Sequence, residues 1–171
     1  MTETLLDHPA VVRVREALTA VNVTTEIVVL AGSARTALQA AEYLGVATAQ
    51  IVNSLVFAVT QADDEGAQEA PPEPLLVLAS GAHRVDTAKV AALLELGRVT
   101  MADPDLVRTT TGFVIGGVAP VGSLTPLRTL VDVSLSRYDT IWAAAGHPRA
   151  VFATTYDEIL RVTGAQAIET T

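Results

Sequence analysis

Residues 110–122 read TTGFVIGGVAPVG, and they form the most unusual stretch of the chain. Four of the chain's eleven glycines fall in it: Gly112, Gly116, Gly117 and Gly122. Paired glycines between a short apolar run and Pro120 indicate a backbone that turns sharply or lies close to another group. Two interpretations stay open. The stretch is either a tight turn at a sheet corner, or a loop whose amides at Gly116, Gly117 and Val118 hold a carbonyl, carboxylate or phosphate oxygen.

The composition is that of one domain with an aliphatic core, spanning residues 1–171. Half of the residues are hydrophobic and the mean hydropathy is +0.39, yet only 4% are aromatic, so Val, Leu, Ile and Ala must form the core. No apolar run approaches the roughly 20 residues of a membrane span, and the N-terminus lacks a secretory signal. The absence of cysteine excludes disulfides and thiolate sites. We expect a cytoplasmic protein without membrane contact.

The charge is unevenly distributed. The net charge is −8, and five acidic residues lie without a basic one in QADDEGAQEAPPEP, residues 61–74, which we interpret as a solvated acidic loop. Without these five residues the net charge would be −3, and Lys89 is the only lysine. Because phosphate contacts need Lys and Arg, this balance argues against DNA binding and against tight unaided RNA binding. Weak or assisted RNA binding stays open.

Hydrophobic periodicity and capping residues predict a single α+β domain around a mixed sheet. We expect helices at about 9–21 (with Arg13 facing outward), from Ser33 to Gly45, at 87–96, from Asp103–Pro104 to about 109, and from Thr155 to about Gly164. We expect short strands at 23–30, 51–60, 75–79, 98–101, 127–133, 141–145 and 151–153, with a tight turn at 146–149.

Asn53 is the one polar residue on the apolar face of strand 51–60. A buried amide without partners costs about 1–3 kcal/mol, so this side chain must be hydrogen-bonded to something. Either neighbouring backbone satisfies it, or it lies at the floor of a pocket and meets a ligand.

A polar turn, residues 80–84, follows strand 75–79 and precedes a helix that Asp86 or Thr87 can cap. Such a turn is a common place for binding groups. His83 could serve as a base or hydrogen-bond donor, and Arg84 could bind a phosphate or carboxylate. The alternative is that both are ordinary surface residues.

Several kinds of chemistry lack their sequence signature. Neither GxGxxG nor GxxxxGK[ST] occurs, so no nucleotide-phosphate loop is indicated. His8, His83 and His147 lack metal-ligand spacing, and no GxSxG is present. The sequence therefore predicts neither a metal nor another cofactor.

Five segments in order resemble the YbaK/EbsC family, relatives of the editing domain inserted in bacterial prolyl-tRNA synthetase. They are QIVNSLVFAV (50–59), LLVLASGAHRVDTAKVA (75–91), MADPDLVRTTTGFVIGGVAPVG (101–122), VDVSL (131–135) and WAAAGHPRAVFATT (142–155). The resemblance covers about residues 10–168. It implies an α+β fold with a mixed, partly barrel-like sheet flanked by helices.

The resemblance also implies a function, that of a free-standing trans-editing deacylase. Such proteins hydrolyse the ester of a small amino acid mischarged on tRNA. The amides of Gly116, Gly117 and Val118 would polarise the ester carbonyl, and a water or the terminal ribose hydroxyl would complete the reaction. The expected partner is the 3′ end of aminoacyl-tRNA, bound weakly or with the help of a synthetase. The residues expected to bind substrate are Pro120, Ser80, Gly81, His83, Arg84, Gly146 and His147.

One departure from the family pattern opens an alternative. The family has a lysine, thought to bind the tRNA end and support hydrolysis, where this chain has Asn53, and Ala82 stands where many relatives carry Asp. An amide donates a hydrogen bond but supplies no charge. We therefore place Asn53 among the catalytic candidates and keep a second interpretation, a non-catalytic module that binds a small molecule, a tRNA end or a partner protein. His83 and Arg84 are the candidates to compensate for the missing charge.

Overall fold

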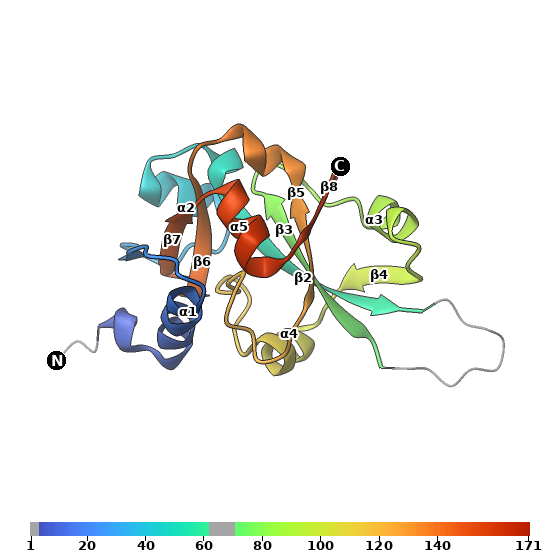
Figure 1. Cartoon of the computed structure of the whole chain (residues 1–171), viewed down its shortest axis with the longest axis horizontal. Coiled ribbons are helices and arrows are strands. Elements are labelled where there is room, and N and C mark those ends of the chain that lie inside the picture. The colour runs from blue at the N-terminus through green and yellow to red at the C-terminus, as the bar shows by residue number, and fades with distance from the viewer. Residues whose placement is uncertain (1–3, 62–70) are drawn as a thin grey trace.

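In the computed structural model, which describes residues 4–61 and 71–171, eight strands form two sheets (Figure 1). The larger sheet has the order β4-β2-β3-β5-β8 and comprises β4 (Arg98–Met101), β2 (Val52–Thr60), β3 (Glu73–Ser80), β5 (Arg128–Asp132) and β8 (Gln166–Ile168). The smaller has the order β1-β7-β6 and comprises β1 (Ile27–Val29), β7 (Ala150–Thr154) and β6 (Ile141–His147).

Five α-helices in the described ranges surround the sheets: α1 (Pro9–Ala20), α2 (Ala37–Leu44), α3 (Thr87–Leu93), α4 (Pro104–Thr111) and α5 (Tyr156–Thr163). Three short 3-10 helices accompany them: η1 (Leu5–Asp7), η2 (Thr48–Gln50) and η3 (Val133–Arg137). In Figure 1, α1 lies beside the smaller sheet and α3 beside β4. None of the helices described is long and apolar enough to cross a membrane.

The pairing confirms a mixed α+β architecture. β2 pairs antiparallel with β3 and β4, whereas β3–β5 and β5–β8 are parallel. The strands lie in two sheets rather than one, and a parallel bridge between Ile51 and Trp142 joins β2 to β6 at the sheet edges.

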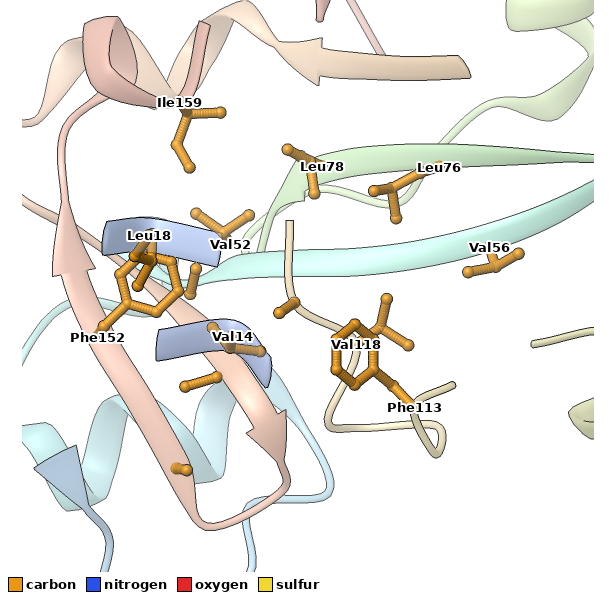
Figure 2. Packing of buried hydrophobic residues seen from close by; sticks show 14 of the residues in the cluster. Val14, Leu18, Val52, Val56, Leu76, Leu78, Phe113, Val118, Phe152 and Ile159 are labelled. Carbon is orange, nitrogen blue, oxygen red and sulfur yellow. The ribbon is translucent and has the colours of Figure 1, made fainter. Parts of the chain in front are cut away.

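Alternating residues of β2 serve two hydrophobic clusters, one on each face of the larger sheet. Val52 and Val56 lie in the main core with Val14 of α1 and with Phe113 and Phe152 (Figure 2). Phe57 and Val59 lie on the opposite face with Val90 of α3. The predicted period-2 alternation is thus confirmed for this strand, and each such side chain contributes about 1.5–3 kcal/mol when fully buried.

Local capping signals set the helix ends as predicted. The Asp103 carboxylate accepts a hydrogen bond from Leu106 N at 2.8 Å, immediately before Pro104 opens α4. The Thr155 hydroxyl accepts one from Glu158 N at 3.0 Å and begins α5. Gly45 and Gly164 end α2 and α5 in the left-handed region, with φ +69° and +64°.

Several segments differ from the sequence prediction, among them α2, which begins at Ala37 rather than near Ser33. The first strand is shorter than 23–30: β1 covers Ile27–Val29, and just before it the Thr25 hydroxyl donates to Ala153 O at 3.0 Å. Helix α3 ends at Leu93, and Glu95 then adopts φ +52°, which no helix allows. β8 and the 3-10 helices were not predicted. Of the acidic loop, residues 62–70 lie outside the described residues, and Glu73 already belongs to β3.

Candidate functional site

A cleft of about 490 Å³ opens where the two sheets meet. Its walls are the start of α2, the start of β2, residues 115–118 of the glycine stretch, and the β6–β7 hairpin. Most lining side chains are apolar, among them Ala34, Ala37, Leu38, Ile51, Val52, Leu55, Ile115, Val118, Trp142, Ala143 and Val151. The polar ones are Arg35, Thr36, Thr48, Asn53 and Ser54. Such a lining suits a small apolar group oriented by a few hydrogen bonds.

The glycine stretch forms a turn at the wall of the cleft. Gly117 N donates to Val114 O at 2.9 Å and closes a turn, so this amide is not available to a ligand. Gly116, at φ +90°, and Val118 line the cleft. Their amides donate no hydrogen bond within the described ranges. Two residues that line the cleft thus have amides without an acceptor in the described part of the chain.

Gly117 is required by close packing. A Cβ at this position would lie 2.8 Å from His147 Cα and 2.9 Å from His147 N, both backbone atoms of the β6–β7 hairpin. Only a residue without a side chain allows the glycine stretch to lie this close to the hairpin.

Arg13 of α1 fixes the glycine stretch from the other side. Its Nε donates to Gly122 O at 2.7 Å and its Nη2 to Thr111 O at 3.1 Å, while the guanidinium lies 4.6 Å from the centre of the Phe113 ring. The prediction that Arg13 faces outward is wrong, because the side chain is half-buried in these contacts. The helical period alone gives no signal for such long-range contacts.

Asn53 lies at the cleft, on the second residue of β2. The side chain is half-buried and makes no hydrogen bond with any residue that the structure describes. Neighbouring backbone therefore does not satisfy its amide. Next to it, Ser54 Oγ is buried without a hydrogen-bond partner in the same ranges. Ser54 lies between the cleft and a smaller chamber of about 40 Å³.

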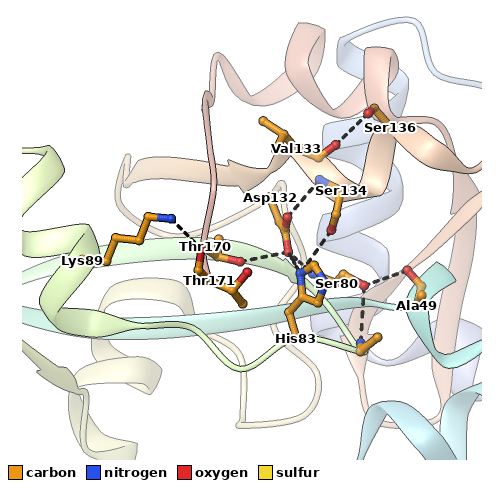
Figure 3. Close-up of polar contacts among 11 residues, drawn as sticks. Ala49, Ser80, His83, Lys89, Asp132, Val133, Ser134, Ser136, Thr170 and Thr171 are labelled. Carbon is orange, nitrogen blue, oxygen red and sulfur yellow. Dashed lines mark hydrogen bonds and ion pairs between the residues drawn. The ribbon is translucent and has the colours of Figure 1, made fainter.

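The polar turn after β3 mainly supports the cleft. Gly81 lines the cleft, and its amide donates to Ile51 O at 2.8 Å. Ser80 is buried behind the wall, where its Oγ donates to Ala49 O at 2.9 Å (Figure 3). His83 and Arg84 do not line the cleft, and Arg84 is exposed without an ion pair among the described residues.

A buried carboxylate that sequence reasoning missed, Asp132 at the end of β5, organises this turn (Figure 3). Its oxygens accept from Ser80 N at 3.0 Å, Ser134 N at 2.9 Å and Thr170 Oγ1 at 3.0 Å, and Oδ2 lies 3.0 Å from His83 Nδ1. Burial raises the pKa of Asp132, but these hydrogen bonds from Ser134, Ser80 and Thr170 outweigh it and hold the pKa below its usual value.

The β6–β7 hairpin supplies the remaining wall. Gly146, at φ +98°, lies against the backbone of Ala10, and Pro148 lines the cleft. His147 Nδ1 accepts a hydrogen bond from Arg149 N at 3.0 Å, and burial together with the charges of His8 and Arg149 lowers the pKa of His147.

Of the predicted site residues, the structure brings four to the cleft itself: Asn53, Gly81, Gly116 and Val118. Gly117, Gly146 and His147 support its walls, whereas Ser80, His83, Arg84 and the buried Pro120 do not line it. Arg35, Ser54 and Trp142 line it without having been predicted. Within residues 4–61 and 71–171, no group of three or more His, Asp or Glu side chains is arranged to hold a metal ion.

Comparison with known proteins places this chain in a family. A family model described as "Aminoacyl-tRNA editing domain" matches residues 31–162. The chain is 32% identical over 127 residues to "Uncharacterized protein YwhH" of Bacillus subtilis (strain 168), a match that covers 74% of each chain.

Two solved structures share the fold. One, described as "a putative trans-editing enzyme for prolyl tRNA synthetase", is 41% identical with a TM-score of 0.81, and the match covers 94% of this chain and 96% of the other. The other, the hypothetical protein APE2540, is 24% identical with a TM-score of 0.78, covers 92% and 97%, and shows the fold alone. The match to the family model over most of the chain shows that this chain belongs to the aminoacyl-tRNA editing domain family.

Proposed function

We propose that this protein is a free-standing trans-editing deacylase that hydrolyses the ester between a small, mischarged amino acid and the 3′ end of its tRNA. The observation that carries the proposal is the cleft with two unengaged amides, those of Gly116 and Val118, beside the unengaged side chain of Asn53. Family membership and the solved structure described as a putative trans-editing enzyme support it.

The proposed reaction needs no side chain as a nucleophile. A water attacks the ester carbonyl carbon, and negative charge develops on the carbonyl oxygen. The neighbouring hydroxyl of the terminal ribose accepts the proton of the water and passes a proton to the ribose oxygen that leaves. Amide donors fixed at the cleft wall stabilise that charge more strongly than the neutral ester, and the removal of one such donor typically slows a reaction about 100- to 1000-fold. The bond to the ribose oxygen then breaks, releasing the amino acid and a tRNA with free terminal hydroxyls. The neutral Asn53 amide donates a hydrogen bond but removes no proton.

Single-turnover deacylation tests the proposal. The panel comprises cysteine, alanine and serine esterified to tRNAs specific for proline, alanine and threonine. We expect one ester to be hydrolysed by the native protein and not by Gly116→Leu, whose side chain fills the cleft wall. Gly164→Leu is the matched control, because Gly164 shares the positive φ but has open space around it, away from the cleft. No hydrolysis above the uncatalysed rate across the panel would overturn the proposal.

The second candidate is a non-catalytic module that binds a small molecule, a tRNA end or a partner protein in the same cleft. The neutral Asn53 favours it, because the residue lines the cleft without supplying a charge. An Asn53→Lys variant separates the two candidates: hydrolysis gained only in the variant would show that the scaffold is competent and the native residue limiting. Given the net charge of −8, we propose that tRNA binds weakly or with the help of a synthetase.

A further inference from the structure

The cleft carries a single charge. Arg35 is the one charged side chain lining it among the described residues, and none of the acidic residues in these ranges lines it, although the chain has 19. In a molecule with a net charge of −8, a cleft with this balance is locally favourable to an anion.

The backbone on both sides of Arg35 is fixed. Ala34 N donates to Pro148 O at 3.2 Å, which ties this segment to the β6–β7 hairpin. Arg35 N donates to Gln39 Oε1 at 2.7 Å, and Gln39 N donates back to Thr36 Oγ1 at 3.2 Å at the start of α2. These hydrogen bonds therefore hold the backbone of Arg35 at the cleft wall.

The guanidinium itself has no protein partner. It is exposed, and it forms no ion pair or hydrogen bond with any residue that the structure describes. Arg13 and Arg149, by contrast, use their guanidinium groups to hold backbone carbonyls. Arg35 thus has a hydrogen-bonded backbone and a planar guanidinium group without a partner, in a cleft that no carboxylate side chain of the described residues lines. Such a guanidinium is suited to bind a phosphate through two parallel hydrogen bonds.

We propose that Arg35 binds a backbone phosphate of the tRNA 3′ end while the aminoacyl ester lies against Asn53 and the glycine stretch. The inference rests on the proposed function for the identity of the ligand, and it assigns to Arg35 the charge that Asn53 does not supply. It also replaces His83 and Arg84 as the compensating residues, because neither of these lines the cleft.

The test is a binding measurement that requires no hydrolysis. Trp142, the only tryptophan of the chain, lines the cleft, so its fluorescence reports occupancy. The ligands are the trinucleotide CCA, adenosine monophosphate and adenosine. The variants are Arg35→Ala and Arg35→Lys, with Arg128→Ala as a matched control, since Arg128 is an exposed arginine outside the cleft.

We expect Arg35→Ala to weaken CCA binding about tenfold, the lower end for a charge-assisted hydrogen bond, and to leave adenosine binding unchanged. The slope of log K against log salt should fall in magnitude by about 0.7, the value for one phosphate contact on a single strand. Arg35→Lys should bind CCA with intermediate affinity, because it keeps the charge and loses the fork. Arg128→Ala should behave as the native protein.

Three results would overturn the inference. If the CCA affinity or the salt slope were unchanged in Arg35→Ala, Arg35 would not contact a phosphate. Equal loss for CCA and adenosine would indicate that Arg35 shapes the cleft. Adenosine monophosphate binding more tightly than CCA would assign the contact to a free nucleotide. If no ester is hydrolysed but Arg35→Ala still loses CCA binding, only the deacylase proposal fails; if esters are hydrolysed and CCA binding is unchanged, only the Arg35 inference fails.

Discussion

At the scale of single residues, Ser54 places a destabilising group beside the cleft. Its buried Oγ has no hydrogen-bond partner in the described part of the chain, and an unsatisfied buried hydroxyl costs about 1–3 kcal/mol. We expect Ser54→Ala to raise the free energy of unfolding by about 1 kcal/mol in urea titrations. The control is Ser80→Ala, which removes the hydrogen bonds to Ala49 O and from Ala82 N and should lower stability. Equal losses in both variants would show that the Ser54 hydroxyl is satisfied.

A second residue-scale prediction concerns the pH dependence of stability. The pKa of Asp132 is lower in the folded protein than in the unfolded chain, so the unfolded chain takes up a proton first as the pH falls. The stabilisation is therefore complete above the unfolded pKa of about 4 and is lost as the pH falls through the folded value. We expect Asp132→Asn to be less stable than the native protein at neutral pH. As the pH falls below about 4, the free energy of unfolding of the variant should decrease less than that of the native protein.

Urea midpoints measured over this pH range check the Asp132 prediction. Asp139→Asn removes an exposed carboxylate and should keep the native profile. If the urea midpoint of Asp132→Asn fell with pH as steeply as that of the native protein, carboxylates other than Asp132 would set the acid sensitivity.

At the scale of elements, the cleft depends on the contact between the glycine stretch and the β6–β7 hairpin. Gly117→Ala would place Cβ 2.8 Å from His147 Cα, so one of two backbones must move. Because a misplacement of about 1 Å can slow catalysis about 100-fold, we expect a loss of that order in single-turnover deacylation, with lowered stability.

The control for this element-scale prediction is Gly164→Ala. Gly164 has φ +64° and open space, so the variant should lose about 1 kcal/mol of stability through backbone strain and keep its deacylation rate. Similar rates for Gly117→Ala and the native protein would show that the two elements can separate without harm to the site.

Element by element, the sequence predicted what local chemistry decides. The caps at Asp103 and Thr155 and the glycine stops at Gly45 and Gly164 depend on residues within one turn, and each is confirmed. β8 was missed because it has only three paired residues, and their partners in β5 are more than 30 positions away in the chain.

The candidate site was predicted in part for the same reason. Gly116 and Asn53 stand out locally, as a glycine pair and as a polar residue in an apolar strand. Arg13, Arg35 and Asp132 do not, because their roles come from partners distant in sequence, such as Gly122 for Arg13 and Ser80 for Asp132. No periodicity or motif reports such pairs.

At the scale of the whole molecule, the architecture explains why one cleft collects residues from five parts of the chain. The bridge between Ile51 and Trp142 brings the edges of the two sheets together, and the glycine stretch and α2 close the space beside that junction. The main core beneath packs α1 against residues of both sheets. Small backbone changes there alter the cleft from several sides at once.

The net charge of −8 also acts at this scale, because it opposes the approach of any polyanion. Four neighbouring acidic residues, Asp63, Asp64, Glu65 and Glu69, contribute half of it, and their exchange for Asn and Gln leaves −4. At about 10 mM ionic strength, where charges interact over about 30 Å, we expect tRNA to associate several-fold faster with this variant, by stopped-flow measurement of Trp142 fluorescence. At about 1 M salt, where the range falls to about 3 Å, the native protein and the variant should converge. A difference that persists at high salt would contradict a long-range electrostatic cause, and no difference at low salt would mean that net charge does not limit the encounter.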